Sequence, residues 1–161
     1  MTARVLVVDD NETNRDLLSR RVSRAGHEVD TAEDGLVALA KLNESPFDLV
    51  LLDVMMPNMN GYETLERIMA DEALSRTRVI MISALDEVDS MVRCIKHGAD
   101  DYLPKPFNPT LLAARMASSL ARKQADVEAR RAEIEVLRGS LAGLGDAEAE
   151  KRAALEVELA K

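Results

Sequence analysis

The chain has 161 residues and a net charge of -8, a length that allows one hydrophobic core of ordinary size and an appendage. Residues 1–120 carry -7 of this charge and residues 121–161 carry -1, which argues against a general affinity for nucleic acid. The sequence has no apolar run long enough to span a membrane, no signal-peptide pattern, and a single cysteine, Cys94, which cannot form an intramolecular disulfide. We therefore expect a cytoplasmic protein that binds neither nucleic acid nor membranes.

Short apolar runs alternate with amphipathic segments along the first 120 residues. Strands are expected at 5–8, 27–31, 48–53, 78–82 and 101–103, and helices at 12–25, 33–43, 62–69, 86–97 and from Asn108 or Thr110 onward. Gly26 and Gly98 are expected to end two of these helices. The alternation predicts an α/β fold in which a five-stranded parallel sheet carries helices on both faces.

Charged and hydroxyl side chains stand where four of these strands end. Asp9 and Asp10 follow the first strand, Asp53 ends the wholly apolar third strand, Ser83 follows the fourth and Lys105 the fifth. A charge at the end of a buried strand is costly unless a ligand uses it. Because the carboxyl ends of parallel strands share the edge where ligands bind, these residues are expected to form one site.

The residue types of this set favour phosphoryl chemistry assisted by a metal ion. Three neighbouring carboxylates repel one another, and their oxygens suit Mg²⁺, or Mn²⁺, better than Zn²⁺. A carboxylate can also attack phosphorus and form an aspartyl phosphate, a reaction that depends on positioning and charge neutralisation. Lys105 and the Ser83 hydroxyl can each contact a phosphoryl oxygen, so the set is complete for phosphorylation of Asp53.

Four motifs in the chain resemble those of the receiver domain of two-component response regulators. They are Val-Leu-Val-Val-Asp9-Asp10-Asn11, Asp48–Gly61, Ile82-Ser83-Ala84 and Asp101–Phe107. The resemblance covers about residues 1–120 and implies a doubly wound, flavodoxin-like sheet with strand order 2-1-3-4-5. It also implies that Asp53 accepts a phosphoryl group from the histidine of a sensor histidine kinase or a phosphotransfer protein. Neither His27 nor His97 lies in a kinase-like phosphoacceptor helix, so we expect the donor to be another protein.

The resemblance also assigns roles to single residues of the site. Asp10, Asp53 and the backbone carbonyl of Met55 would bind Mg²⁺ directly, and Asp9 would act mainly through water. A cis peptide bond at Lys105-Pro106 would aim Lys105 into the site. Such a receiver catalyses only its own phosphorylation and dephosphorylation, so no turnover enzyme is expected.

Two further pairs of residues concern the response and its lifetime. Ser83 and Tyr102 match a switch pair, in which Ser83 moves toward the phosphoryl oxygens and Tyr102 turns inward. This movement would reshape the face made by helix 86–97, strand 101–103 and the helix that follows. Met55 and Leu85 flank the path of a hydrolytic water and are both apolar, so we expect slow loss of the phosphoryl group.

The last receiver helix shows no clear stop at residue 120 and leads into a helical tail, 121–161. Heptad numbering puts Leu120, Val127, Ile134, Leu141 and Leu155 at a, and Met116, Lys123, Arg130, Leu137 and Leu144 at d. The polar d positions make this a coiled-coil pattern of moderate quality, and an amphipathic tail folded back on its own domain is the alternative. Glycines at 139, 143 and 145 predict a break at 139–145, followed by a last helix at 147–160 that Asp146 could cap. We expect a homodimer formed through 110–161.

Other classes of protein remain as alternatives. The chain could be a complete single-domain regulator, or the N-terminal regulatory part of a larger cyclase, phosphatase or diguanylate cyclase. A haloacid-dehalogenase-type phosphatase uses similar groups but expects Asp-x-Asp after the first strand, which Asp9-Asp10-Asn11 lacks. A purely structural coiled-coil dimer that has lost phosphorylation is disfavoured because the acidic set is intact.

Overall fold

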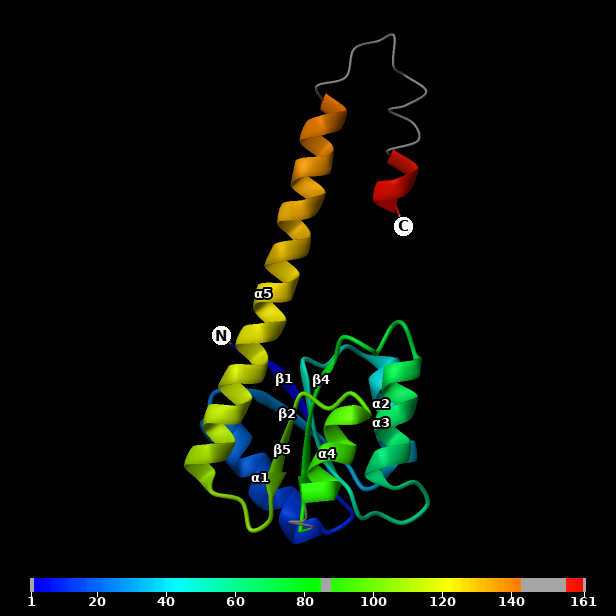
Figure 1. Cartoon of the computed structure of the whole chain (residues 1–161). Coiled ribbons are helices and arrows are strands. Elements are labelled where there is room, and N and C mark those ends of the chain that lie inside the picture. Colours follow the sequence, from blue (N-terminus) through cyan, green and yellow to red (C-terminus); the bar gives the residue numbers. More distant parts are fainter. Residues whose placement is uncertain (1, 85–87, 143–155, 161) are drawn as a thin grey trace. The chain divides into compact units, whose positions relative to one another are not determined.

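The computed structural model describes residues 2–84, 88–142 and 156–160. In these ranges five parallel strands form one sheet (Figure 1): β1 (Arg4–Val8), β2 (Glu28–Ala32), β3 (Leu49–Asp53), β4 (Arg78–Ser83) and β5 (Asp101–Pro104). The strands lie in the order β2-β1-β3-β4-β5, which confirms the predicted doubly wound α/β fold.

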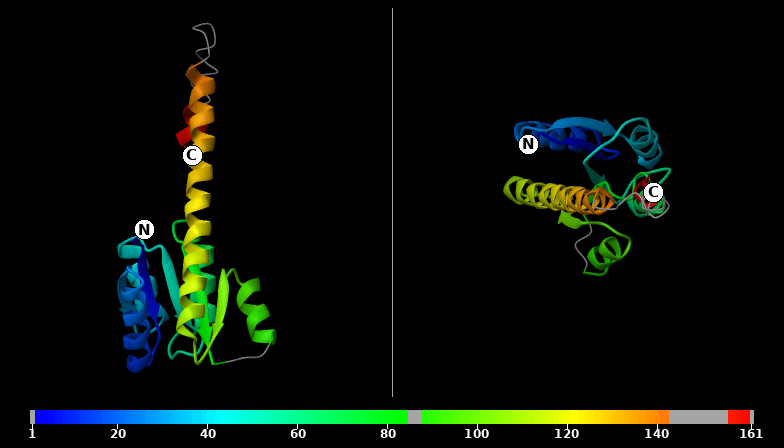
Figure 2. Two further views of the ribbon diagram at one scale, coloured as in Figure 1. Left: turned by 90° about the vertical axis from the view of Figure 1, so that its left-hand side faces the viewer. Right: turned by 90° about the horizontal axis from the view of Figure 1, so that it is seen from above.

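Helices cover both faces of the sheet. They are α1 (Glu12–Arg24), α2 (Gly35–Glu44), α3 (Gly61–Ala70), α4 (Val88–Lys96) and α5 (Pro109–Ala142). The helix α1 and the first part of α5 lie on one face, and α2, α3 and α4 lie on the other (Figure 2). The chain divides into two compact units, Met1–Lys123 and Gln124–Lys161. Among the described residues, no helix is both long and apolar enough to cross a membrane.

The alternation of side chains along each strand builds two hydrophobic cores. In β1, Leu6 and Val8 belong to the core under α2, α3 and α4, whereas Val5 and Val7 belong to the core under α1 and α5. Every residue of β3 is buried because this central strand has apolar layers on both sides. The wholly apolar run before Asp53 is therefore the expected sequence of a central parallel strand.

Side-chain caps place the start of the first three helices. Asn11 accepts the Asn14 N–H at the start of α1, and Asp34 accepts the Val37 N–H at the start of α2. Asn60 starts α3. After the C-terminal ends of α1 and α4, Gly26 and Gly98 adopt φ values of 91° and 104°, a region that glycine enters without strain.

The first residues of the predicted break at 139–145 are helical in the structure. The helix α5 continues through Gly139 to Ala142, because a single glycine costs only ~1 kcal/mol in a long helix. The rest of the predicted break, 143–145, lies outside the described residues, as do Leu85, Leu144, Asp146 and Leu155. Of the predicted last helix, residues 156–160 are described, and they are helical.

Candidate functional site

Three carboxylates meet at the carboxyl edge of the sheet. Asp9 and Asp10 follow β1, and Asp53 is the last residue of β3, the strand beside it. One oxygen from each of the three lies within 4.8 Å of the others. Asp9 and Asp53 are 1% and 5% exposed, whereas Asp10 is exposed. The structure thus brings together the three acidic residues that the sequence placed at strand ends, with one open side.

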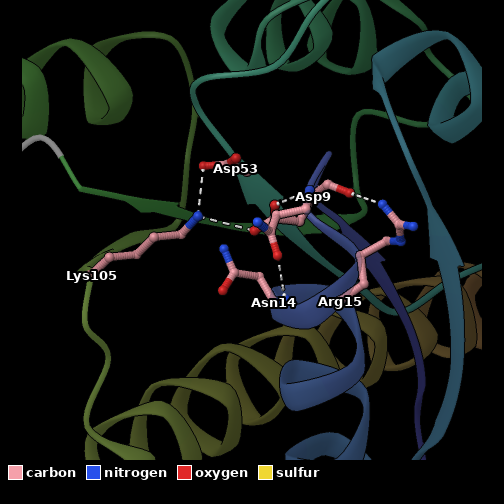
Figure 3. A network of polar contacts seen from close by, with 6 residues as sticks. Asp9, Asn14, Arg15, Asp53 and Lys105 are labelled. Atoms are coloured by element: carbon pink, nitrogen blue, oxygen red, sulfur yellow. Dashed lines mark hydrogen bonds and ion pairs between the residues drawn. The ribbon is translucent and has the colours of Figure 1, made fainter.

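Lys105 joins two of these carboxylates (Figure 3). Its Nζ lies 3.0 Å from Asp9 Oδ2 and 3.2 Å from Asp53 Oδ1. The Lys105 N–H donates to the Ser83 carbonyl at 2.7 Å, which fastens the loop after β5 to the end of β4. The Lys105-Pro106 peptide bond is cis, as expected. The ammonium group is therefore held between the acid that would react and the acid beside it.

The electrostatics of the site are unbalanced toward negative charge. Burial and the neighbouring Asp9 carboxylate raise the pKa of Asp53 to about 6, and Lys105 offsets only part of this rise. Burial alone would lower the pKa of Lys105, but the carboxylates of Asp9 and Asp53 outweigh it and raise that pKa. Lys105 therefore stays charged at neutral pH, while the ionised form of Asp53 is disfavoured.

The donor set fits a hard divalent cation. Three carboxylate groups within reach of one another, two of them buried, are oxygen ligands of the kind that Mg²⁺ or Mn²⁺ prefers. No cysteine or histidine belongs to this described cluster. A bound cation would relieve the repulsion that raises the pKa of Asp53.

A close backbone approach fixes the loop that follows Asp53. The Gly61 N–H donates to the Val54 carbonyl at 2.8 Å, and the Val54 N–H donates to the Ile82 carbonyl at 3.3 Å. A Cβ atom at Gly61 would collide with the backbone of Asp53 and Val54. Helix α3 can therefore begin against the end of β3 only because residue 61 is glycine. Met55, in the same loop, has a side chain that is 63% exposed.

The two residues of the expected switch pair lie on neighbouring strands. Ser83 ends β4 and is fully buried, and the residue before it, Ile82, stands opposite Asp53 in the sheet register. Tyr102 lies in β5 and is 4% exposed, within the core under α2, α3 and α4. The Tyr102 side chain is thus buried in that core.

Two residues beside the site were not apparent in the sequence. Arg15 Nη1 donates to the Asp9 carbonyl at 2.8 Å, and the side chain of Asn14 points toward Lys105 (Figure 3). Both residues lie on the first turn of α1, and no spacing rule singles out a helix residue that reaches back to the strand end. The position of α1 on the sheet is what brings them near the carboxylates.

The loop after Asp53 has a second anchor that the sequence also did not reveal. Asn58 has a φ of 66° and its Nδ2 donates to Asp34 Oδ2 at 3.2 Å. The Asp34 side chain, 8% exposed, also caps α2. Because the two residues are 24 positions apart, only the packing of α2 beside the loop pairs them.

The fold and the site together are those of a receiver. Residues 5–117 match the family described as the response regulator receiver domain. The chain belongs to this family.

Relatives and solved structures agree with this assignment. The chain is 47% identical over 120 residues to the "Transcriptional regulatory protein CpxR homolog" of Haemophilus influenzae, covering 74% of this chain and 51% of that protein. It is 40% identical over 118 residues to the response regulator PleD of Caulobacter vibrioides, covering 73% of this chain and 26% of that protein. The chemotaxis protein CheY4 of Vibrio cholerae superposes with a TM-score of 0.66 at 34% identity, covering 76% of this chain and 98% of that chain. The chain thus spans about half, or less, of the length of these two curated relatives.

Proposed function

We propose that this chain receives a phosphoryl group on Asp53 from a histidine kinase or phosphotransfer protein and passes the change to its helical tail. The observation that carries this proposal is the position of Lys105 Nζ between Asp9 and Asp53, within a cluster of three carboxylates. In the reaction, an Asp53 oxygen attacks the phosphorus of a phosphohistidine. A P–O bond forms, the P–N bond breaks, and the departing imidazole takes up a proton.

The remaining residues of the site stabilise the charge that develops on the phosphoryl oxygens. Lys105 supplies one positive charge, and the Ser83 hydroxyl and nearby backbone N–H groups supply hydrogen bonds. Asp10, Asp53 and the Met55 carbonyl would hold Mg²⁺, with Asp9 acting through water. When bound, the ion neutralises part of the phosphoryl charge.

The donor can approach the site along a groove of about 460 Å³ beside Lys105. Apolar side chains from α1 and from the loop after β5 line it, among them Leu17, Leu18 and Phe107. Leu17 is 42% exposed, which is a large exposure for an apolar residue next to a polar site. Such a groove suits a protein donor better than a small phosphate ester.

The response would travel through Ser83 and Tyr102 to the face made by α4, β5 and α5. This face carries exposed apolar side chains, including Met91, Ile95 and Leu111. Tyr102→Trp fluorescence should change with Mg²⁺ and beryllofluoride, in a manner that requires Asp53. Unchanged fluorescence would contradict the coupling, whichever position the residue occupies at rest.

The output of the whole protein is a separate proposal. We propose a homodimer through 110–161, a coiled-coil tail at 121–161, and no turnover activity of the chain itself. The chain matches only part of relatives that include a transcriptional regulator and PleD, so it also fits the regulatory part of a longer protein. The expectation that it does not contact nucleic acid applies to these 161 residues.

The direct test uses the purified chain, Mg²⁺ and a small phosphodonor such as phosphoramidate. Intact mass spectrometry should show one added phosphoryl group that hydroxylamine removes, as expected for an acyl phosphate. Asp53→Asn should abolish the addition, and Asp16→Asn, which changes an exposed acid of α1, should leave it unchanged. Phosphorylation that persists in Asp53→Asn, or that ignores chelation of Mg²⁺, would contradict the proposal.

A further inference from the structure

The residues of α5 that follow Lys123 belong to a unit separate from the receiver, and most of their side chains are exposed. Met116 and Leu120, which begin the predicted seam, are buried in the receiver's own core at 2% and 4% exposure. Lys123 pairs with Asp48 at 2.8 Å. The part of the seam open to another helix therefore begins after Lys123, in the unit Gln124–Lys161.

This open stretch has apolar positions at coiled-coil spacing. Val127 and Leu137 are half-buried, and Ile134 is 39% exposed. They occupy a, d and a positions of one heptad frame. A second helix can bury an apolar stripe of this spacing, and the charged residues on both sides of the stripe determine which helix pairs with it and in which orientation.

The flanking charges have a fixed order. Asp126 and Glu133 occupy successive g positions, and Arg131 and Arg138 occupy successive e positions, all on the exposed surface of α5. Each acid precedes the arginine of the next heptad by five residues. In a parallel, in-register pair of helices, a g residue faces the e residue five positions later on the partner helix. Asp126 would then face Arg131 of the second copy, and Glu133 would face Arg138.

The opposite orientation makes only unfavourable contacts. Antiparallel helices bring g beside g and e beside e. Here that would place acid against acid on one flank and arginine against arginine on the other. The charge pattern therefore discriminates between the two orientations of a homodimer.

We propose that the occupant of this seam is a second copy of the same chain, in parallel and in register, joined after Lys123. This inference deepens the proposed homodimer and rests on it. Arg130, at the d position between Val127 and Ile134, would face its own counterpart and lay its aliphatic stem along the seam. The described seam spans fewer than three heptads and contains this charge, so the association is weak and open to control by the receivers.

Disulfide trapping in the full chain tests the orientation. The substitutions Val127→Cys and Leu137→Cys lie ten residues apart, about 15 Å along the helix. They occupy an a position and a d position, both of which point toward the partner helix. In a parallel pair both variants should cross-link to themselves, because each residue meets its own counterpart. In an antiparallel pair only one point of the helix can lie opposite itself. Ala132→Cys, at an f position that points away from the partner helix, is the matched control and should not cross-link. The native chain shows whether the buried Cys94 cross-links by itself.

Light scattering on the same samples separates the failures. A monomer at every concentration would overturn the homodimer and with it this inference. A dimer in which neither cysteine cross-links would place the contact elsewhere and overturn the seam alone. A cross-link that forms only when the two variants are mixed would establish the antiparallel arrangement and overturn the orientation.

A charge exchange provides a second readout. Glu133→Arg turns two symmetry-related attractive pairs into repulsive ones and should weaken dimerisation by about tenfold. Adding Arg138→Glu should restore it, because the pair is recreated with reversed sign. A double variant as weak as the single one would contradict a parallel pairing.

Discussion

Replacing Asp53 by asparagine should stabilise the metal-free protein while abolishing its reaction. Burial beside Asp9 raises the pKa of Asp53 from 3.8 to about 6, so folding disfavours its charged form. A difference of this size corresponds to about 3 kcal/mol at pH 7.5, because each pKa unit is worth about 1.4 kcal/mol. The side chain is 6% exposed, so solvent screening removes little of this cost. The raised pKa already includes the opposing contact with Lys105, and because asparagine does not reproduce every hydrogen bond of the neutral carboxyl group, we expect a net gain of about 1–3 kcal/mol.

The pH dependence of the gain identifies its cause. A carboxyl whose pKa is raised in the folded state destabilises the fold above that pKa, and the cost disappears as pH falls toward the unfolded value of 3.8. The difference between Asp53→Asn and the native chain should therefore be largest above pH 6 and fall to about 1 kcal/mol at pH 4.5. Urea unfolding in EDTA at both pH values measures it.

Two comparisons make this prediction refutable. Asp16→Asn removes an exposed acid from α1 and should change stability by less than about 0.5 kcal/mol at either pH. With Mg²⁺ present, the native chain should gain stability and Asp53→Asn should gain less. A stabilisation below about 0.5 kcal/mol at pH 7.5, or one that does not shrink at low pH, would show that the charge of Asp53 is not the source of strain.

Four further changes test other parts of the structure. Gly61→Ala forces a Cβ into the backbone of Asp53 and Val54 and should cost about 2–4 kcal/mol by urea unfolding, whereas Gly139→Ala, with no atom within 4 Å of the added Cβ, should stabilise by about 0.5–1 kcal/mol. Met55→Asn combined with Leu85→Glu should speed hydrolysis of the phosphorylated chain, followed by intact mass over time; an unchanged lifetime would contradict slow loss through apolar residues. Arg130→Leu should lower the dimer dissociation constant in sedimentation equilibrium at least tenfold, and no change would remove residue 130 from the seam.

The opposition between stability and reactivity has a simple origin in this site. The features that would make Asp53 reactive toward phosphorus are its burial, its like-charged neighbours and the nearby ammonium group of Lys105. These features also make its charged form costly. A divalent cation or a phosphoryl group changes that balance, so occupancy of the site should report directly in the stability of the receiver.

The sequence by itself determined the sheet and the acids at its edge. The run Leu49–Leu52 is apolar throughout, which only a strand covered on both faces requires, and Asp53 after it is tolerated only at a ligand-binding edge. The helix stops at Gly26 and Gly98 are local, because each depends on a few neighbouring residues. Such features can be predicted without knowing what lies across the fold.

The tertiary structure decided which partner each surface meets. The pairing of Asn58 with Asp34 and the contact of Arg15 with the Asp9 carbonyl depend on how α2 and α1 pack, and no local pattern encodes them. The heptad stripe of α5 is the clearest case. Met116 fits the heptad spacing of this stripe, yet the core of the receiver covers it, and the spacing would be the same if a second helix covered it. Periodicity reports that one face of a helix is apolar, but only the packed structure shows what covers that face.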